Sequence, residues 1–260
     1  MNPLIALDEA TKRFHVGTPD EAILFDAFSF SAQEGEFVSI IGSNGSGKTT
    51  LLNLLCGSMT PDSGRILYRG RDVTRMKEHQ RAAFIGRVFQ DPARGSCAGL
   101  TLLQNLALAD NKGKRYGLGR AVSRSRVDEY RTRLEMCGMG LENRLQVTAG
   151  SLSGGQRQAL ALVLATMTDI EALLLDEHTA ALDPKSSERV MEVTRTLVEK
   201  KKITTLMVTH NLRFAVEYGD RLVMMHEGKA KLDLKGEQKR AASIDDLLRA
   251  FNEISIECGN

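Results

Sequence analysis

Short apolar runs alternate along this chain with polar turns and helix-forming stretches. The runs Phe37–Ile41, Ala172–Leu175 and Thr204–Val208 are continuously apolar, which predicts buried strands rather than half-exposed ones. The first run ends in a glycine-rich turn that leads into Thr49–Cys56, a segment of helical composition. Strand–helix alternation of this kind predicts an α/β fold with a mainly parallel sheet.

Further elements can be placed from the same pattern. Gly64–Arg69 and Phe84–Phe89 are expected to be strands, and Arg221–Gly228 with Lys229–Leu234 is expected to form a late hairpin. A terminal helix is expected over Ser243–Phe251, because Ser243 suits an N-cap and two aspartates follow in the first turn.

The stretch from Asp91 to Met167 lacks strand-like runs and is rich in helix formers. We therefore interpret the chain as one domain over 1–260, with an α/β core of 1–90 and 168–260 and an inserted helical subdomain of 91–167. The middle of that subdomain, Lys112–Arg133, holds eight basic and two acidic residues. Such a run is more typical of a solvated helical face than of a nucleic-acid contact, although it could also lie near lipid headgroups.

The composition is that of a globular protein. Hydrophobic residues make up 42% and charged residues 26% of the 260 residues, and the net charge is only +2. A balance this even gives no general attraction to nucleic acid or to an anionic membrane. The longest apolar run, Ala159–Met167, is too short to span a bilayer, so the chain is not expected to cross a membrane by itself.

One motif carries most of the chemical information. Gly42–Thr49 reads Gly-Ser-Asn-Gly-Ser-Gly-Lys-Thr, which fits the phosphate-binding pattern G-x4-G-K-[ST] between a predicted strand and a predicted helix. Its glycines allow successive N–H groups to point inward, and the helix beginning at Lys48 adds a positive dipole end. Lys48 is expected to reach the β- and γ-phosphates, and the Thr49 hydroxyl is a suitable Mg²⁺ ligand.

A second acidic centre follows the apolar run at Leu173–Leu175. Asp176 and Glu177 come at the end of this predicted strand, which in a parallel sheet is the ligand-binding edge. Asp176 is expected to hold Mg²⁺ through the ion's water shell, and Glu177 to orient or deprotonate a water aimed at the γ-phosphate. Alone, such a pair could equally well cap the next helix.

The pentapeptide Leu-Ser-Gly-Gly-Gln at 152–156 lies ahead of the acidic strand. With it, the chain resembles the ABC-type ATPases, the nucleotide-binding subunits of ABC transporters. Phe14 matches the aromatic residue that stacks on adenine, Gln90 the glutamine loop, Ala181–Asp183 the D-loop and His210 the switch histidine. These motifs occur in the family's order, and the resemblance extends from about residue 4 to residue 251.

The resemblance implies a P-loop NTPase fold of ABC type with an antiparallel N-terminal β portion. It also implies ATP and Mg²⁺ as cofactors and assigns roles to residues of this chain. The residues assigned to catalysis are Lys48, Gln90, Glu177 and His210. The residues assigned to Mg²⁺ are Thr49, Gln90 and Asp176. The residues assigned to nucleotide binding are Phe14, Gly42, Ser43, Asn44, Gly45, Ser46, Gly47, Lys48, Thr49, Thr50, Ser153, Gly154, Gly155, Gln156 and Asp183.

Family members work as head-to-tail pairs, in which each ATP lies between the phosphate loop of one copy and the signature pentapeptide of the other. Phosphate binding from both sides holds the pair together, and hydrolysis releases it. The resemblance thus implies a second copy of the chain and a polytopic permease as partners, often with an extracytoplasmic solute-binding protein, and no nucleic acid. It implies a peripheral location at the cytoplasmic face of the membrane. The run Leu175–Pro184, together with Val88–Pro92, resembles a bacterial branch assigned to uptake of tryptophan, tyrosine or similar solutes.

Three positions depart from the family pattern. His178 stands where proline is usual, and Ala180 stands where the D-loop usually begins with serine. The helix after the signature, Gln158–Leu164, lacks two arginines that many relatives carry. His178 could hydrogen-bond near the site or titrate near neutral pH, or it could be a tolerated turn residue.

Two other functions compete with transport. A soluble ABC ATPase of DNA repair or of the ribosome is one. The repair relatives place long coiled coils between the two motifs, whereas Lys48 and Ser153 are only 105 positions apart here. The ribosome-linked relatives usually carry two cassettes. The other alternative is a nucleotide switch without turnover, which the presence of Glu177 disfavours.

Overall fold

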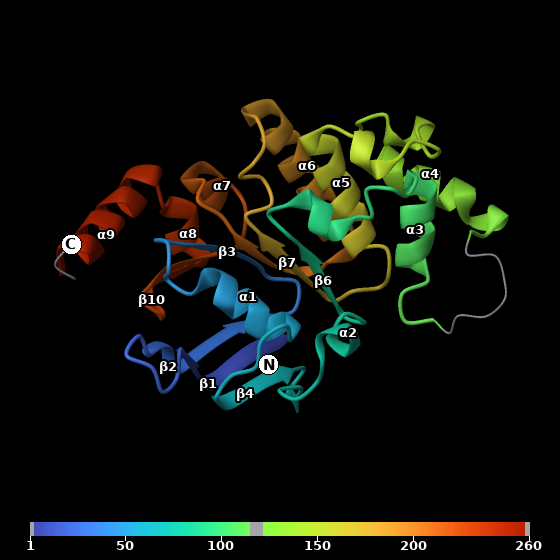
Figure 1. Cartoon of the computed structure of the whole chain (residues 1–260). Helices are drawn as coiled ribbons and strands as arrows, with labels where there is room; N and C mark the ends of the chain where they lie inside the picture. Colours follow the sequence, from blue (N-terminus) through green and yellow to red (C-terminus); the bar gives the residue numbers. More distant parts are fainter. Residues whose placement is uncertain (1–2, 115–121, 258–260) are drawn as a thin grey trace. The chain divides into compact units, whose positions relative to one another are not determined.

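The structure is a computed structural model that describes residues 3–114 and 122–257 (Figure 1). The chain divides into two compact units. Unit 1 comprises residues 1–82 and 203–260, and unit 2 comprises residues 83–202. The structural division thus assigns the strand at 85–88 and the segment 168–202 to the same unit as the helical segment, whereas the sequence analysis drew its boundaries at 90 and 168.

The first part of unit 1 is an antiparallel sheet in the order β2-β1-β4-β5. Its strands are β1 (Ile5–Phe14), β2 (Ala22–Ala32), β4 (Ser63–Tyr68) and β5 (Arg71–Asp72). In Figure 1, β1, β2 and β4 lie side by side. This sheet is the antiparallel β portion that the family resemblance implied.

The second part of unit 1 is built on β3 (Phe37–Gly42), whose six residues are all buried. It pairs in parallel with β8 (Thr204–Val208) and β9 (Arg221–His226), and β10 (Lys229–Lys235) pairs antiparallel with β9. The continuous apolar runs therefore form parallel strands, and the late hairpin is confirmed, because its two segments are β9 and β10.

Helices complete unit 1. They are α1 (Lys48–Cys56), α2 (Glu78–Arg81), α7 (Leu212–Glu217), α8 (Gly236–Ala241) and α9 (Ile244–Glu257). Ile41, Leu222, Met224 and Leu247 form a buried cluster with Ala215, which seats α7 and α9 against the strands. The N-cap assignment at the start of α9 is correct, because Ser243 Oγ accepts a hydrogen bond from Asp246 N at 3.2 Å.

The end of α1 is closed by a side chain from far along the sequence. Arg81 is fully buried, and its guanidinium donates to the carbonyl oxygens of Leu54 and Leu55 at 2.7 and 2.9 Å and to those of Val73 and Thr74 at 2.7 and 2.9 Å. The bonds to Leu54 and Leu55 reach carbonyls in the last turn of α1, where the helix ladder ends, and the bonds to Val73 and Thr74 tie that turn to the segment after β5. Burial lowers the pKa of this guanidinium, but not enough to remove its charge.

Unit 2 contains the parallel strands β6 (Ile85–Val88) and β7 (Ala172–Asp176), paired so that Val88 lies opposite Leu175. Its α-helices are α3 (Leu102–Asp110), α4 (Val127–Glu135), α5 (Gly154–Ala165) and α6 (Pro184–Lys201). Short 3-10 turns lie at Pro92–Gly95, Arg124–Arg126, Leu141–Asn143 and Ala149–Ser151. The described residues between β6 and β7 form helices and turns, with one isolated bridge between Thr101 and Thr148.

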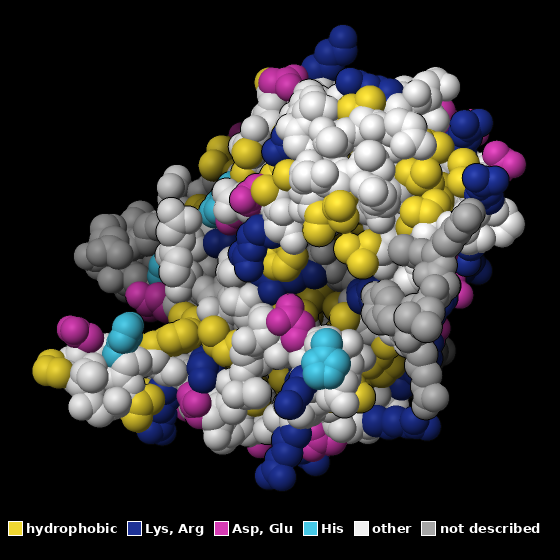
Figure 2. Space-filling view, turned by 45° about the vertical axis from the view of Figure 1, so that its right-hand side comes forward, with side chains coloured by type: hydrophobic (Ala, Val, Ile, Leu, Met, Phe, Trp, Pro, Cys, Tyr) yellow, Lys and Arg dark blue, Asp and Glu magenta, His cyan; other side chains and the backbone are white. Residues whose placement is uncertain are grey.

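The basic stretch at 112–133 is partly neutralised within unit 2. Asp110 forms ion pairs with Lys114 and Arg126, and Glu129 forms ion pairs with Arg126 and Arg133. Residues 115–121 of the stretch lie outside the described residues. On the face shown in Figure 2, basic and acidic side chains both occur, as expected for a nearly neutral chain. Within the described part of the chain, no helix combines the length and apolar character needed to span a bilayer.

Candidate nucleotide site

The phosphate loop Gly42–Thr49 lies where the sequence places it, between β3 and α1 in unit 1. Its tip, Ser43–Gly45, is exposed, whereas Ser46, Gly47 and Lys48 are buried. Two backbone bonds hold the loop: Ser46 N donates to Ser43 O at 3.3 Å, and Gly228 N donates to Ser46 O at 3.1 Å. An exposed tip above a braced base suits a ligand that approaches from solvent.

Two glycines of the loop are required by close neighbours as well as by backbone shape. Gly42 has a φ of +152°, and a Cβ there would lie 2.1 Å from the carbonyl oxygen of Met225. Gly47 has a φ of +101°, and its Cβ would lie 2.8 Å from the ring of Phe25 on β2. Glycine at these positions lets the loop pass close to β9 at Gly42 and close to β2 at Gly47 before it turns into α1.

Lys48 braces the loop from within. Its ammonium donates to the carbonyl oxygens of Gly42 and Ser43 at 2.8 and 2.7 Å and lies 3.4 Å from Ser46 Oγ. The side chain is therefore held over the loop that a phosphate would occupy, and its positive charge adds to the dipole at the start of α1. Thr49 and Thr50 follow in the first turn of α1, with Thr49 exposed.

His210 is brought to the same edge of unit 1 as the loop. Val208 lies opposite Ile40 in the parallel ladder between β8 and β3, and Thr209 N continues it by donating to Ile40 O at 3.1 Å. The next residue, His210, is exposed at the carboxyl end of β8. Phe14 is half-buried at the end of β1, with the ammonium of Lys12 5.9 Å from the ring centroid.

The carboxylate pair and Gln90 share an edge of unit 2. Asp176 ends β7 and is buried, Glu177 follows it half-buried, and Gln90 is exposed two residues after β6. Because β6 and β7 are parallel, all three residues follow the carboxyl ends of their strands. Glu177 has a φ of +49°, a left-handed conformation that costs a non-glycine residue about 1 kcal/mol and that clusters at functional sites.

The signature pentapeptide caps α5. Ser153 Oγ accepts a hydrogen bond from Gln156 N, and Gln156 Oε1 accepts one from Ser153 N, both at 3.3 Å. This reciprocal pair is a capping box, which leaves the Ser153 hydroxyl proton able to donate to a ligand. Ser153 and Gly154 are exposed, whereas Gly155 is buried, where a Cβ would lie 3.0 Å from Ser186.

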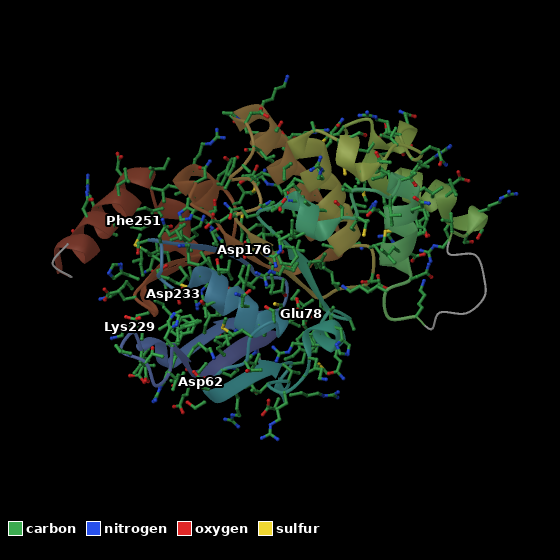
Figure 3. All side chains as sticks on the ribbon, in the orientation of Figure 1. Asp62, Glu78, Asp176, Lys229, Asp233 and Phe251 are labelled. Atoms are coloured by element: carbon green, nitrogen blue, oxygen red, sulfur yellow. The ribbon has the colours of Figure 1, made fainter. Side chains whose placement is uncertain are left out.

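Two side chains near these motifs were missed by the sequence analysis. Arg87 of β6 donates to Asp176 Oδ2 at 2.8 Å, and the two side chains are 10% and 11% exposed. Asp176 is labelled in Figure 3. Gln158 of α5 is buried and donates to the carbonyl oxygen of Phe89, next to Gln90, at 3.1 Å. The sequence did carry a signal for both residues: Arg87 is a charged residue inside an otherwise apolar strand, and Gln158 is an amide on an apolar helix.

Comparison with known proteins places these motifs in one family. The family model described as "ABC transporter" matches residues 25–180. The tyrosine transport ATP-binding protein of Clostridioides difficile is 42% identical over 95% of this chain and 98% of its own length. The chain therefore belongs to the ABC transporter family.

Other relatives agree with this assignment. The sulfate/thiosulfate import ATP-binding protein of Mycobacterium bovis is 36% identical over 88% of this chain, which spans 60% of that relative's length. A solved ATP-binding cassette, dimeric and bound to ADP and Pi after hydrolysis, has a TM-score of 0.75 and 28% identity over 89% of this chain and 98% of its own. This protein is thus an ATPase of the ABC type, an ATP-binding subunit of a transporter, as the motifs predicted.

The D-loop of this ABC ATPase is exposed at Ala180 and Ala181. Asp183 ends it and caps α6, where its carboxylate accepts from Ser186 N at 3.1 Å and Ser186 lowers its pKa. The nucleotide contact expected for Asp183 stays a prediction. The helix α5 is buried along Ala159–Val163. This apolar segment is the part of the helix in which many relatives carry two arginines.

His178 lies in the turn after β7, as one alternative had it, but it is buried there and does not titrate near neutral pH. It is 2% exposed, and burial lowers its pKa to about 4. Its Nε2 lies 3.3 Å from Thr194 Oγ1, whose own proton is donated to Val190 O at 2.8 Å. Thr194 therefore accepts, and Nε2 carries the proton of a neutral imidazole. Of the alternatives for this residue, titration near neutral pH is wrong, because desolvation outweighs the ordinary basicity of the ring.

The low pKa of His178 predicts a pH-dependent stability. Between pH 6.5 and 4 the unfolded chain takes up a proton at this residue and the folded chain does not. Stability linked to His178 is therefore complete above pH 6.5 and is lost as pH falls toward 4, by roughly 3 kcal/mol at most. The measurement is the slope of unfolding free energy against pH for His178→Gln. The slope should flatten in this window, whereas replacement of the exposed His79 should leave it unchanged.

Proposed function

We propose that this chain powers import of a small solute, an amino acid of the tyrosine or tryptophan kind, through a separate polytopic permease. The observation that carries the proposal is the near full-length similarity to a tyrosine transport ATP-binding protein, together with a complete set of family motifs. The chain would then act at the cytoplasmic face of the membrane, held there by the permease. An extracytoplasmic solute-binding protein would complete the system.

The proposed chemistry uses the residue roles that the family resemblance implies. The loop Gly42–Thr49 binds the phosphates through its N–H groups, and Lys48 adds its charge. Glu177 orients the attacking water, while His210 contacts the γ-phosphate. Because only water attacks, the step is a direct transfer of the phosphoryl group and forms no covalent enzyme intermediate.

Mg²⁺ fits the oxygen groups available on the chain. Asp176 offers a carboxylate at the end of β7, Thr49 a hydroxyl on the first turn of α1, and Gln90 an amide oxygen. Mg²⁺ in proteins is usually bound through one or two carboxylates plus phosphate oxygens and water, so this small set is sufficient. When bound, the ion would neutralise charge on the β- and γ-phosphates.

A pair of copies is part of the proposal. The exposed Ser153 and Gly154 present a helix N-terminus, a suitable surface for the phosphates of a nucleotide held by a second copy. The solved relative with ADP and Pi is dimeric, which supports this arrangement. Nucleic acid is not a proposed partner, since Lys114, Arg126 and Arg133 of the stretch 112–133 are paired with acids.

Uptake by cells tests the transport role. In cells that lack this chain, entry of labelled tyrosine or tryptophan is expected to fall to the passive level. The parent chain should restore it and the Lys48→Ala variant should not, because that variant cannot hold the phosphates. Lys229→Ala, which changes an exposed lysine on β10, should restore it fully. Unchanged uptake of both amino acids would contradict the proposed solute class.

A further inference from the structure

Asp176, a residue proposed to hold Mg²⁺, forms an ion pair with Arg87. Arg87 lies in β6, where the flanking Ile85, Gly86 and Val88 are buried, and its Nη2 lies 2.8 Å from Asp176 Oδ2. A guanidinium this close stabilises the charged carboxylate. The same carboxylate is the group proposed to hold Mg²⁺. The Arg87 guanidinium therefore already supplies the carboxylate of Asp176 with the positive charge that the metal would supply.

The guanidinium of Arg87 also lies near an aromatic ring, that of Phe89. The guanidinium carbon of Arg87 lies 4.6 Å from the centroid of the Phe89 ring, and that of Arg94 lies 4.3 Å from the same centroid. The Phe89 ring thus lies close to two arginines, Arg87 and Arg94. Of this pair, Arg87 is the one that donates a hydrogen bond to Asp176. Arg94 can therefore serve as the control for Arg87 in a mutational test, because both arginines lie near the same ring.

Arg87 also has space into which it can move. A pocket of about 420 Å³ in unit 2 is lined by Arg87 and Arg94, together with polar and apolar residues that include Asn105, Leu108 and Leu164. A guanidinium that leaves Asp176 can therefore stay near the Phe89 ring or turn toward this pocket. The position near the ring keeps the charge stacked, so release does not leave it buried alone.

We propose that Arg87 is a positioning residue that holds the Asp176 carboxylate while Mg²⁺ is absent and gives it up when the metal–nucleotide complex binds. This inference rests on the proposed function, since it takes Asp176 as a Mg²⁺ group. Two cations compete for one carboxylate, so the arginine raises the Mg²⁺ concentration needed for tight nucleotide binding. In the absence of the metal it keeps a buried carboxylate paired.

Binding of a fluorescent ATP analogue, titrated with Mg²⁺, tests the competition. The Glu177→Gln background is expected to slow turnover strongly, so the readout is metal-dependent binding and not activity. In that background Arg87→Met is expected to lower the half-saturating Mg²⁺ concentration by about tenfold, in line with the net strength of a hydrogen bond between charged groups. Nucleotide affinity measured without Mg²⁺ should stay unchanged, because the phosphate loop is intact.

Three further variants separate competition from a merely structural role. Arg87→Lys keeps a positive charge and should stay closer to the parent than Arg87→Met. Arg94→Gln removes the other cation on Phe89 and should leave the Mg²⁺ dependence within about twofold of the parent. If Arg87→Met does not fold, Arg87→Gln takes its place with the same expected direction. A structural role alone would lower thermal stability without moving the Mg²⁺ titration.

The two levels of the account fail in different ways. If nucleotide affinity in the Glu177→Gln background with Arg87 intact does not depend on Mg²⁺, the assignment of Asp176 to the metal site is contradicted. The proposed chemistry would then fail as well. A parent that responds to Mg²⁺, with an Arg87→Met variant whose half-saturating concentration is unchanged or higher, would overturn only the role given to Arg87.

Discussion

Replacing Glu177 with Gln is expected to slow ATP hydrolysis by on the order of 10²- to 10³-fold while ATP still binds. Glutamine has the same shape but cannot take a proton from the attacking water. The residue follows the buried strand β7 with a φ of +49°, and the substitution changes no backbone requirement there. The loss should therefore appear in turnover and not in folding.

The same variant should accumulate as an ATP-bound pair of copies. If phosphate binding by loop and signature holds the pair together, then blocking hydrolysis blocks its release. Size-exclusion chromatography with light scattering in Mg²⁺ and ATP would detect the pair, which should vanish when ADP replaces ATP. Glu135→Gln, at the exposed end of α4, is the matched control and should behave as the parent. Parent-like turnover in Glu177→Gln would remove this residue from the water-positioning role.

Replacing Lys48 with Ala should abolish useful ATP binding and reduce hydrolysis by on the order of 10²- to 10³-fold. The ammonium has two functions in the structure. It supplies charge over the phosphate loop, and it ties the carbonyl oxygens of Gly42 and Ser43 together from within. Alanine removes both, so the loop loses its cation and its internal brace.

Isothermal titration with ATP, and phosphate release under saturating Mg²⁺, would measure the effect of Lys48→Ala. Lys229→Ala changes an exposed lysine of the same unit, labelled in Figure 3, and should bind ATP as the parent does. Near-normal turnover in Lys48→Ala would contradict the assignment of the phosphate loop, provided that the far-ultraviolet spectrum shows a folded chain.

Much of the fold follows from short-range patterns in the sequence. The strand β3, the loop after it and the helix α1 are contiguous, so local periodicity and glycine spacing are enough to place them. The hairpin of β9 and β10 is likewise local, and the cap at Ser243 needs only the next three residues. The signature's capping box is another short-range feature.

The partners of the candidate site residues could not be predicted in the same way. Arg87 meets Asp176 across 89 positions of sequence, and that contact depends on the register of β6 against β7. His178 lies in a turn, as one alternative had it, but its burial comes from packing next to Thr194 on α6, which the turn pattern does not show. Arg81 binds carbonyls of α1 that lie 26 and 27 positions earlier. Such contacts arise from tertiary packing, which residue patterns along one segment do not encode.

Isolation of the tagged chain from detergent-solubilised membranes of its own organism tests the central claim most directly. Mass spectrometry should find a polytopic membrane protein in stoichiometric amount, because the proposed function couples ATP hydrolysis to a separate permease. A solute-binding protein in the same sample would support import. Recovery with ribosomal proteins or nucleic acid, and with no membrane protein, would contradict the account and favour a soluble ABC ATPase.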